Sequence, residues 1–242
     1  MIRYDFPQRS EEWFRRRLGI PTSSEFDKLV TPGKWDPSKQ AVGYMRRLLA
    51  EWMLDAPLDD PTTQWMDRGT QLEAQAYRSY EFETDTETEA VGLITTDDGM
   101  VACSPDRLIK GKPWGLELKC PSAPVHVGYM LDRSVDAAYL PQVQGQLLIG
   151  EFERVDIQSY FPGLPTVIIP VYRDEAKIKA LKQALGAFVE TLLACRAKIC
   201  QEWGQFPRPK PTAKQLGDDG LGITDEDVEA IIARAHSSAR RG

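Results

Sequence analysis

The sequence has little of the material on which several common functions depend. It contains only four cysteines, with no C-x-x-C pair among them, and only two histidines, His126 and His236. These residues leave little material for a histidine-based zinc site or for a Ser-His-Asp triad. No apolar run approaches the length needed to span a bilayer, and the first residues form no apolar signal segment. We therefore expect a reduced cytoplasmic protein that does not enter a membrane.

Positive charge is not in excess either, because 36 acidic side chains oppose 30 basic ones and give a formal charge of −6. This balance argues against a generally cationic protein that coats nucleic acid, so any contact with DNA must be local. The length of 242 residues fits one domain of ordinary size with a sizeable core, and it leaves room for a tail.

Residues 100–120 predict a β-hairpin that brings charged side chains of both signs together. Two mostly apolar segments flank residues 110–115, which contain two glycines and one proline. Side chains alternate along a strand, so Glu117 and Lys119 project from one face, and Asp106 can lie across from Glu117. A pair of carboxylates and an amine are thus predicted to share a small volume.

Oxygen ligands of this kind suit a hard dication such as Mg2+, which polarises a phosphate and lowers the pKa of a bound water. Lys119 would orient that water or deprotonate it, and the second role requires nearby dications to lower the pKa of Lys119 substantially. Spacing alone leaves open a surface hairpin with an ordinary Glu117–Lys119 ion pair.

The sequence of this hairpin resembles that of a known group of nucleases. Asp106 followed eleven residues later by Glu-Leu-Lys is similar to the Asp…Glu-x-Lys core of the restriction-endonuclease-like nucleases. The longer pattern Ser-Pro-Asp…Gly-Leu-Glu-Leu-Lys-Cys-Pro resembles the phage lambda exonuclease, or YqaJ-type viral recombinase, family more specifically. The resemblance implies an α/β fold with a restriction-endonuclease-like core, in which a central mixed β-sheet is flanked by α-helices. We expect a nuclease domain at 1–203, and a linker with a short C-terminal helical extension at 204–242.

A second motif lies near the amino terminus, where Ser10 is predicted to cap a short helix that ends near Gly19. The pattern Trp-x-x-x-Arg-x-Gly followed by Thr-x-Ser-Glu spans residues 13–25 and is a signature of the same family. The resemblance assigns Arg17, helped by Ser24, to the 5′-terminal phosphate of DNA, whose oxygens a planar guanidinium can match in pairs. The structural alternative is that the arginines merely suit the carboxyl end of the helix.

Two further helices carry residues that the resemblance places at the site. On a helix predicted at 64–83, Glu73 matches the acidic position of the family's Gly-x-x-x-Glu segment. On a helix predicted at 137–149, Gln142 and Gln144 match the family's Gln-x-Gln pattern, with Gln142 as the preferred site residue and Gln144 as an additional one. Without the resemblance, all three would be interpreted as solvated polar side chains.

The resemblance implies a Mg2+-dependent 5′→3′ exodeoxyribonuclease, with Mn2+ as a substitute for Mg2+, in a bacterial or phage-infected cell. It would digest one strand of linear double-stranded DNA to 5′-mononucleotides and leave 3′ single-stranded tails for phage-type recombination. A homotrimeric ring around DNA and a single-strand-annealing protein as partner are implied as well. The implied metal ligands are Asp106, Glu117, Glu73 and the carbonyl of Leu118, and the implied catalytic set adds Lys119 and Gln142.

Two alternatives remain open at this point. The first is a CRISPR-associated or RecB-like nuclease with the same core, although the cysteine spacing here does not match the four-cysteine iron–sulfur site common in those relatives. The second is a catalytically silent module that binds DNA ends, which the complete set Asp106, Glu117 and Lys119 argues against.

Overall fold

The computed structural model describes residues 1–58 and 64–207. The chain divides into two compact units, Met1–Gln205 and Phe206–Gly242. The C-terminal extension predicted at 204–242 lies outside the described residues from position 208 onward. All the helices and strands that the structure describes belong to the first unit.

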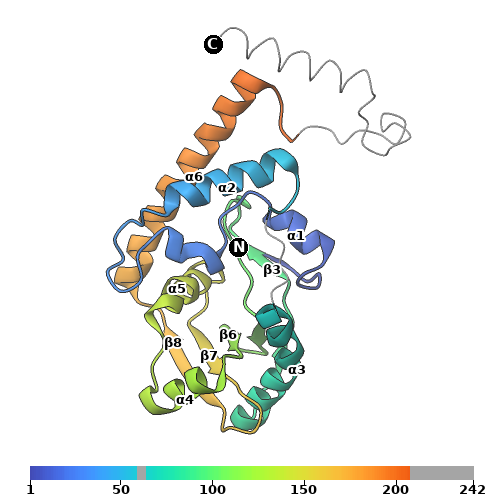
Figure 1. Cartoon of the computed structure of the whole chain (residues 1–242), viewed down its shortest axis with the longest axis vertical. Helices are drawn as coiled ribbons and strands as arrows, with labels where there is room; N and C mark the ends of the chain where they lie inside the picture. The colour runs from blue at the N-terminus through green and yellow to red at the C-terminus, as the bar shows by residue number, and fades with distance from the viewer. Residues whose placement is uncertain (59–63, 208–242) are drawn as a thin grey trace, which may run out of the picture. The chain divides into compact units, whose positions relative to one another are not determined.

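A mixed five-stranded sheet forms the centre of the first unit (Figure 1), with the strand order β2-β5-β6-β7-β8. β6 and β7 pair in parallel, whereas the other neighbouring strands pair antiparallel. The strands are β2 (Thr88–Glu89), β5 (Arg107–Ile109), β6 (Trp114–Lys119), β7 (Arg154–Ser159) and β8 (Val167–Tyr172). β6, which carries the predicted Glu-x-Lys pair, therefore has a neighbouring strand on each side.

A smaller antiparallel sheet has the order β1-β3-β4. Its strands are β1 (Ile2–Tyr4), β3 (Leu93–Thr95) and β4 (Ala102–Cys103). The prediction of one continuous strand before the hairpin turn is wrong, because the segment is divided between β4 and β5, which belong to different sheets. Pro105 lies in the break, where it lacks an N–H to donate and restricts the backbone of Ser104. Asp106 consequently precedes β5 instead of lying within a strand.

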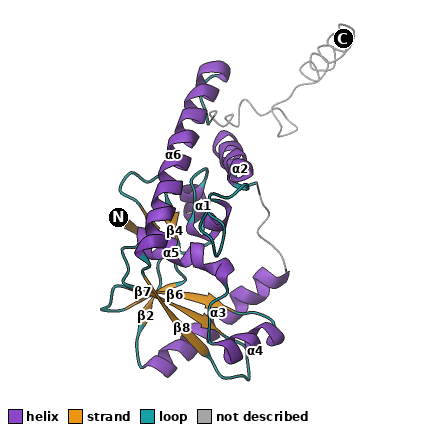
Figure 2. Cartoon of the chain, turned by 90° about the vertical axis from the view of Figure 1, so that its left-hand side faces the viewer, coloured by secondary structure: helices purple, strands orange, loops and turns teal. Residues whose placement is uncertain are grey.

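Helices pack against the five-stranded sheet on both faces (Figure 2). α3 (Gln64–Thr84) and α5 (Leu140–Ile149) contact its central strands. The other helical segments of the described residues are α1 (Glu11–Arg17), η1 (Ser23–Lys28), α2 (Ala41–Leu54), α4 (Ala123–Asp132), η2 (Ala137–Tyr139) and α6 (Glu175–Trp203). The helices predicted at 64–83 and 137–149 thus appear as α3 and as η2 with α5. The cap predicted for α1 is also present, because Ser10 Oγ accepts a hydrogen bond of 3.3 Å from the N–H of Trp13.

The two faces of the sheet are distinct in β7, where side chains alternate. Val155 and Ile157 belong to the main apolar core together with Val143 and Leu147 of α5. Asp156 points to the opposite face and binds a side chain of α3. Glu117 pairs with Ile157 across the parallel strands, so it faces α5. The alternation of β6 therefore decides which helix meets each of its side chains.

None of the helices in the described part of the chain has both the length and the apolar character needed to cross a membrane.

Candidate active site

The predicted pair on β6 lies at the centre of a polar network. Glu117 is buried, with only 6% of its side chain exposed. Lys119 Nζ lies 2.8 Å from Glu117 Oε1, and it is 4.4 Å from the centre of the Tyr139 ring. Because a buried carboxylate is costly unless it is paired and hydrogen-bonded, this arrangement is not an ordinary surface ion pair.

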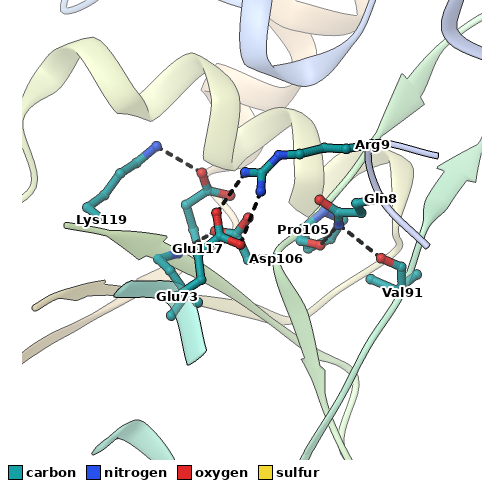
Figure 3. A network of polar contacts seen from close by, with 9 residues as sticks. Gln8, Arg9, Glu73, Val91, Pro105, Asp106, Glu117 and Lys119 are labelled. Atoms are coloured by element: carbon teal, nitrogen blue, oxygen red, sulfur yellow. Dashed lines mark hydrogen bonds and ion pairs between the residues drawn. The ribbon is translucent and has the colours of Figure 1, made fainter. Parts of the chain in front are cut away.

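Asp106 reaches the same place from the break before β5. Its Oδ2 atom accepts a hydrogen bond of 2.6 Å from the N–H of Leu118, the residue between Glu117 and Lys119. Burial, followed by the negative charge of Glu117, raises the pKa of Asp106 well above its usual value. Figure 3 shows the two carboxylates side by side. Two acidic groups in one poorly solvated place favour either a shared proton or a bound cation.

Two glutamines of α5 hold Glu117 from above the sheet. Gln142 Nε2 donates to Glu117 Oε1 at 2.7 Å, and Gln142 Oε1 accepts from Lys119 Nζ at 3.3 Å. Gln146 Nε2 donates to Glu117 Oε2 at 2.6 Å, so each oxygen of the carboxylate has an amide donor. The Oε1 atom of Gln146 is buried without a hydrogen-bond partner.

Gln144, predicted as an additional site residue, does not belong to this group. Its Nε2 donates to the carbonyl of Tyr172 and its Oε1 accepts from the N–H of Asp174, at 2.9 and 3.1 Å. Residues two apart on a helix point about 200° from each other, whereas residues four apart share a face. Gln144 therefore ties α5 to the segment between β8 and α6. Gln146, not Gln144, is the second glutamine that contacts Glu117. It lies four residues after Gln142, and this spacing could have identified it from the sequence.

Glu73 comes from α3, which packs on β6 and β7, and its side chain is 35% exposed. Its carboxylate is bound by Arg9, a residue that the sequence did not single out. Arg9 Nη2 lies 2.7 Å from Glu73 Oε1, and Nη1 lies 3.5 Å from Oε2. Figure 3 shows this guanidinium beside the carboxylates of the site. Three carboxylates and two cationic side chains thus meet here.

The chemistry of these donors fits Mg2+, which prefers carboxylate and carbonyl oxygens. Asp106 and Glu117 offer carboxylate oxygens side by side, and burial, followed by the negative charge of Glu117, raises the pKa of Asp106. Among residues 1–58 and 64–207, however, no group of three or more His, Cys, Asp or Glu side chains is arranged to hold a metal ion. Glu73, the third carboxylate, is bound by Arg9.

Arg17 lies at a separate place, at the end of α1. Its Nη2 donates to Thr22 Oγ1 at 3.2 Å and to Ser24 Oγ at 3.5 Å, and its guanidinium carbon lies 3.8 Å from the centre of the Trp13 ring. Burial lowers the pKa of Arg17 to about 10. A partly desolvated guanidinium held by hydroxyls and an aromatic ring is well placed to receive an anion.

The neighbouring arginines differ from Arg17. Arg15 and Arg16 each lie 2.9 Å from Glu12 on the surface of α1. Thr22 also has a role that the sequence did not reveal, because its N–H donates to the hydroxyl of Tyr44 at 3.1 Å and so fixes the loop beside Arg17.

Comparison with known proteins gives a consistent result. The family model of the YqaJ-like viral recombinase domain matches residues 12–153, which is more than half of the chain and includes every predicted site residue. An alkaline exonuclease from Laribacter hongkongensis, LHK-Exo, is 27% identical with a TM-score of 0.72, and the match covers 80% of this chain and 97% of that one. The structure of LHK-Exo in complex with dAMP gives 27% identity, the same coverage and a TM-score of 0.71.

A phage-related exonuclease from Haemophilus somnus 129PT has a TM-score of 0.61 at 12% identity, over 74% of this chain and 96% of that one, and shares the fold. No curated protein matches the sequence. The structural matches confirm the predicted α/β fold with a mixed central sheet flanked by helices.

Proposed function

Because the chain belongs to the family of YqaJ-like viral recombinase domains and is therefore a nuclease, we propose that it is a Mg2+-dependent 5′→3′ exodeoxyribonuclease. It digests one strand of linear double-stranded DNA to 5′-mononucleotides and leaves 3′ single-stranded tails for strand annealing. The observation that carries this proposal is the meeting of Asp106, Glu117 and Lys119 under the two amides of α5. The similarity to LHK-Exo, an alkaline exonuclease, supports the same choice.

In this proposal Asp106 and Glu117 hold Mg2+, or Mn2+ in its place, with the Leu118 carbonyl and Glu73 as further ligands. The bound dication supplies Lewis-acid polarisation of the phosphate and a water of lowered pKa. Gln142 and Gln146 orient the Glu117 carboxylate so that its remaining lone pairs face the other ligands.

Lys119 acts as a hydrogen-bond donor in the state described. Burial lowers its pKa, but the attraction and hydrogen bond of Glu117 outweigh this effect, so the pKa of Lys119 is raised overall. The side chain is therefore an ammonium group. Gln142 accepts one of its hydrogen bonds and fixes its direction. From there Lys119 orients the attacking water and stabilises the negative charge of the phosphate.

Digestion of an end-labelled duplex tests the proposed activity. Linear double-stranded DNA carrying a label at either the 5′ or the 3′ end is incubated with the protein in Mg2+ or in excess chelator. We expect the 5′ label to appear rapidly as a mononucleotide in Mg2+ and not in chelator, while the 3′ label stays on a shortening strand. Release of the 3′ label first would reverse the proposed direction, and stable binding without release would favour a DNA-end-binding module.

Arg17 supports the 5′→3′ direction, because a guanidinium held beside the Ser24 hydroxyl suits a terminal phosphate. Hydrogen bonds to charged groups contribute about 1.5–3 kcal/mol, so Arg17→Ala is expected to reduce the preference for 5′-phosphorylated over 5′-hydroxyl ends by roughly 10–100-fold. The measurement is the ratio of initial digestion rates on the two substrates. Arg16→Ala, which removes a surface partner of Glu12, is the matched control. An Arg17→Ala protein with an unchanged ratio would exclude this residue from phosphate binding.

The proposal also includes a homotrimeric ring that encloses DNA and a single-strand-annealing protein as partner, in the cytoplasm of a bacterial or phage-infected cell. Its support is the membership of the recombinase family. Within the described residues, no cysteine cluster could hold the iron–sulfur site expected of the RecB-like alternative.

A further inference from the structure

We propose that Arg9 is an internal counter-ion of the acidic site, which binds Glu73 when no dication is present and must release it when one binds. The inference rests on the proposed function, because it assumes that Asp106, Glu117 and Glu73 bind a dication. It adds a positioning residue that competes with the metal and so sets how tightly the metal is held.

The segment that carries Arg9 is fixed directly over the site. Gln8 Nε2 donates to the carbonyls of Val91 and Pro105, at 2.9 and 2.8 Å, and Pro105 is the residue before Asp106. On the other side of Arg9, Ser10 Oγ donates to the carbonyl of Pro7 at 2.6 Å and caps α1. Figure 3 shows Gln8 and Arg9 diverging from this segment, with only Arg9 directed to the carboxylates. The backbone position of Arg9 is thus fixed by the fold, while its side chain is half exposed.

The backbone of Arg9 is in an unusual conformation for its residue type. Its φ angle is 64°, in the left-handed region that residues with a Cβ rarely adopt. Such a conformation persists where surrounding contacts fix it. The hydrogen bonds of Gln8 and Ser10 provide these contacts, and the resulting turn directs the guanidinium onto Glu73 at 2.7 Å.

Charge explains why the site holds this guanidinium. The negative charges of Glu117 and Glu73 both act on Asp106, and Lys119 is the only other cationic side chain that contacts the carboxylates among the described residues. Three carboxylates with one ammonium group keep an excess of negative charge, which Arg9 reduces. A dication reduces this negative charge more strongly and needs the same Glu73 oxygens as ligands. Arginine has only N–H donors, so it cannot itself coordinate the metal. Arg9 and the metal therefore compete for Glu73.

Mn2+ binding in the absence of DNA tests the competition, by calorimetry on the full chain. Arg9→Asn removes the charge and retains a residue that tolerates a positive φ. We expect this variant to bind Mn2+ roughly fivefold more tightly than the wild type, as removal of an ion pair worth about 1 kcal/mol predicts. Arg9→Lys, which keeps the charge, should bind Mn2+ with an affinity between the two. The melting temperature should show the same order, with a larger Mn2+-induced increase for Arg9→Asn.

Two controls make the result specific. Arg3→Asn breaks an ion pair of equal length, 2.7 Å to Glu89, with similarly exposed side chains but away from the site, and should leave Mn2+ affinity unchanged. In a Glu73→Gln background, Arg9→Asn should no longer tighten binding, because the contested carboxylate is absent.

The reference experiment is Glu117→Gln, which should abolish Mn2+ binding. If it does, and Arg9→Asn binds Mn2+ no more tightly than the wild type, the counter-ion role alone is overturned. If the wild type binds no Mn2+, or if its Mn2+ binding does not depend on Glu117, the metal-dependent function is overturned and this inference with it.

Discussion

Lys119→Ala is expected to slow DNA cleavage by about 10²–10³-fold, the range found when one hydrogen-bond donor that stabilises charge in the transition state is removed. The variant loses the contacts with Glu117 at 2.8 Å and Gln142 at 3.3 Å, and with them the only ammonium group that the described residues bring to the carboxylate pair. The two carboxylates remain, so the dication should still bind. The loss should therefore appear in the rate of the chemical step, measured in single-turnover digestion of 5′-labelled duplex at saturating Mg2+.

The control for this loss is a lysine of the same sheet that also forms an ion pair. Lys110, next to β5, lies 2.8 Å from Glu87 on the surface, and Lys110→Ala should digest DNA at the wild-type rate. Binding of Mn2+ by Lys119→Ala should be equal to or tighter than that of the wild type, because a competing cation has gone. Wild-type digestion by Lys119→Ala would remove this residue from the mechanism, whereas slow digestion with lost Mn2+ binding would point to a damaged site.

The parts of the site that follow from local periodicity could be predicted from the sequence. Alternation along a strand places Glu117 and Lys119 on one face of β6, as the structure shows. Helical periodicity likewise relates Gln142 to Gln146, although that relation was missed in favour of Gln144. Gln144 instead binds the backbone of Tyr172 and Asp174, where β8 ends and α6 begins. These partners are 28 and 30 positions away along the chain, so no local pattern predicts them.

Contacts between residues far apart in the sequence could not be predicted from local patterns. Arg9 and Glu73 are 64 positions apart, and their contact requires both the turn at Arg9 and the packing of α3 on β6 and β7. No spacing rule links such residues. The break between β4 and β5 was recognisable in principle from Pro105, but which sheet each half joins is decided by pairing with distant strands. Asp106 gains its orientation from that break, by capping the N–H of Leu118.

On the opposite face of the sheet, β7 carries an ion pair between Arg154 and Asp156, and a hydrogen bond from Tyr80 joins α3 to it. Asp156 is fully buried and accepts hydrogen bonds from Arg154 Nε at 2.6 Å, from Arg154 Nη2 at 2.8 Å and from the Tyr80 hydroxyl at 2.7 Å. The Arg154 guanidinium also lies 4.4 Å from the centre of the Trp114 ring. Burial and the hydrogen bond to Asp156 raise the pKa of Tyr80, so this hydroxyl remains a donor. Because Tyr80 and Glu73 are both on α3, the network also fixes the helix that reaches the acidic site.

Asp156→Ala is expected to lower the free energy of unfolding by about 3–5 kcal/mol, because it leaves a guanidinium and a hydroxyl without their shared acceptor inside the protein. For a chain of this size the melting temperature should fall by roughly 6–20 °C. Tyr80→Phe removes one hydrogen bond and keeps the ion pair, so it should cost only about 1 kcal/mol. Glu175→Ala, which breaks an exposed pair with Arg173, should leave stability nearly unchanged. Denaturant unfolding of the three variants gives the comparison, and an Asp156→Ala protein as stable as Tyr80→Phe would show that the Arg154–Asp156 ion pair of β7 adds little stability beyond the hydrogen bond to Tyr80.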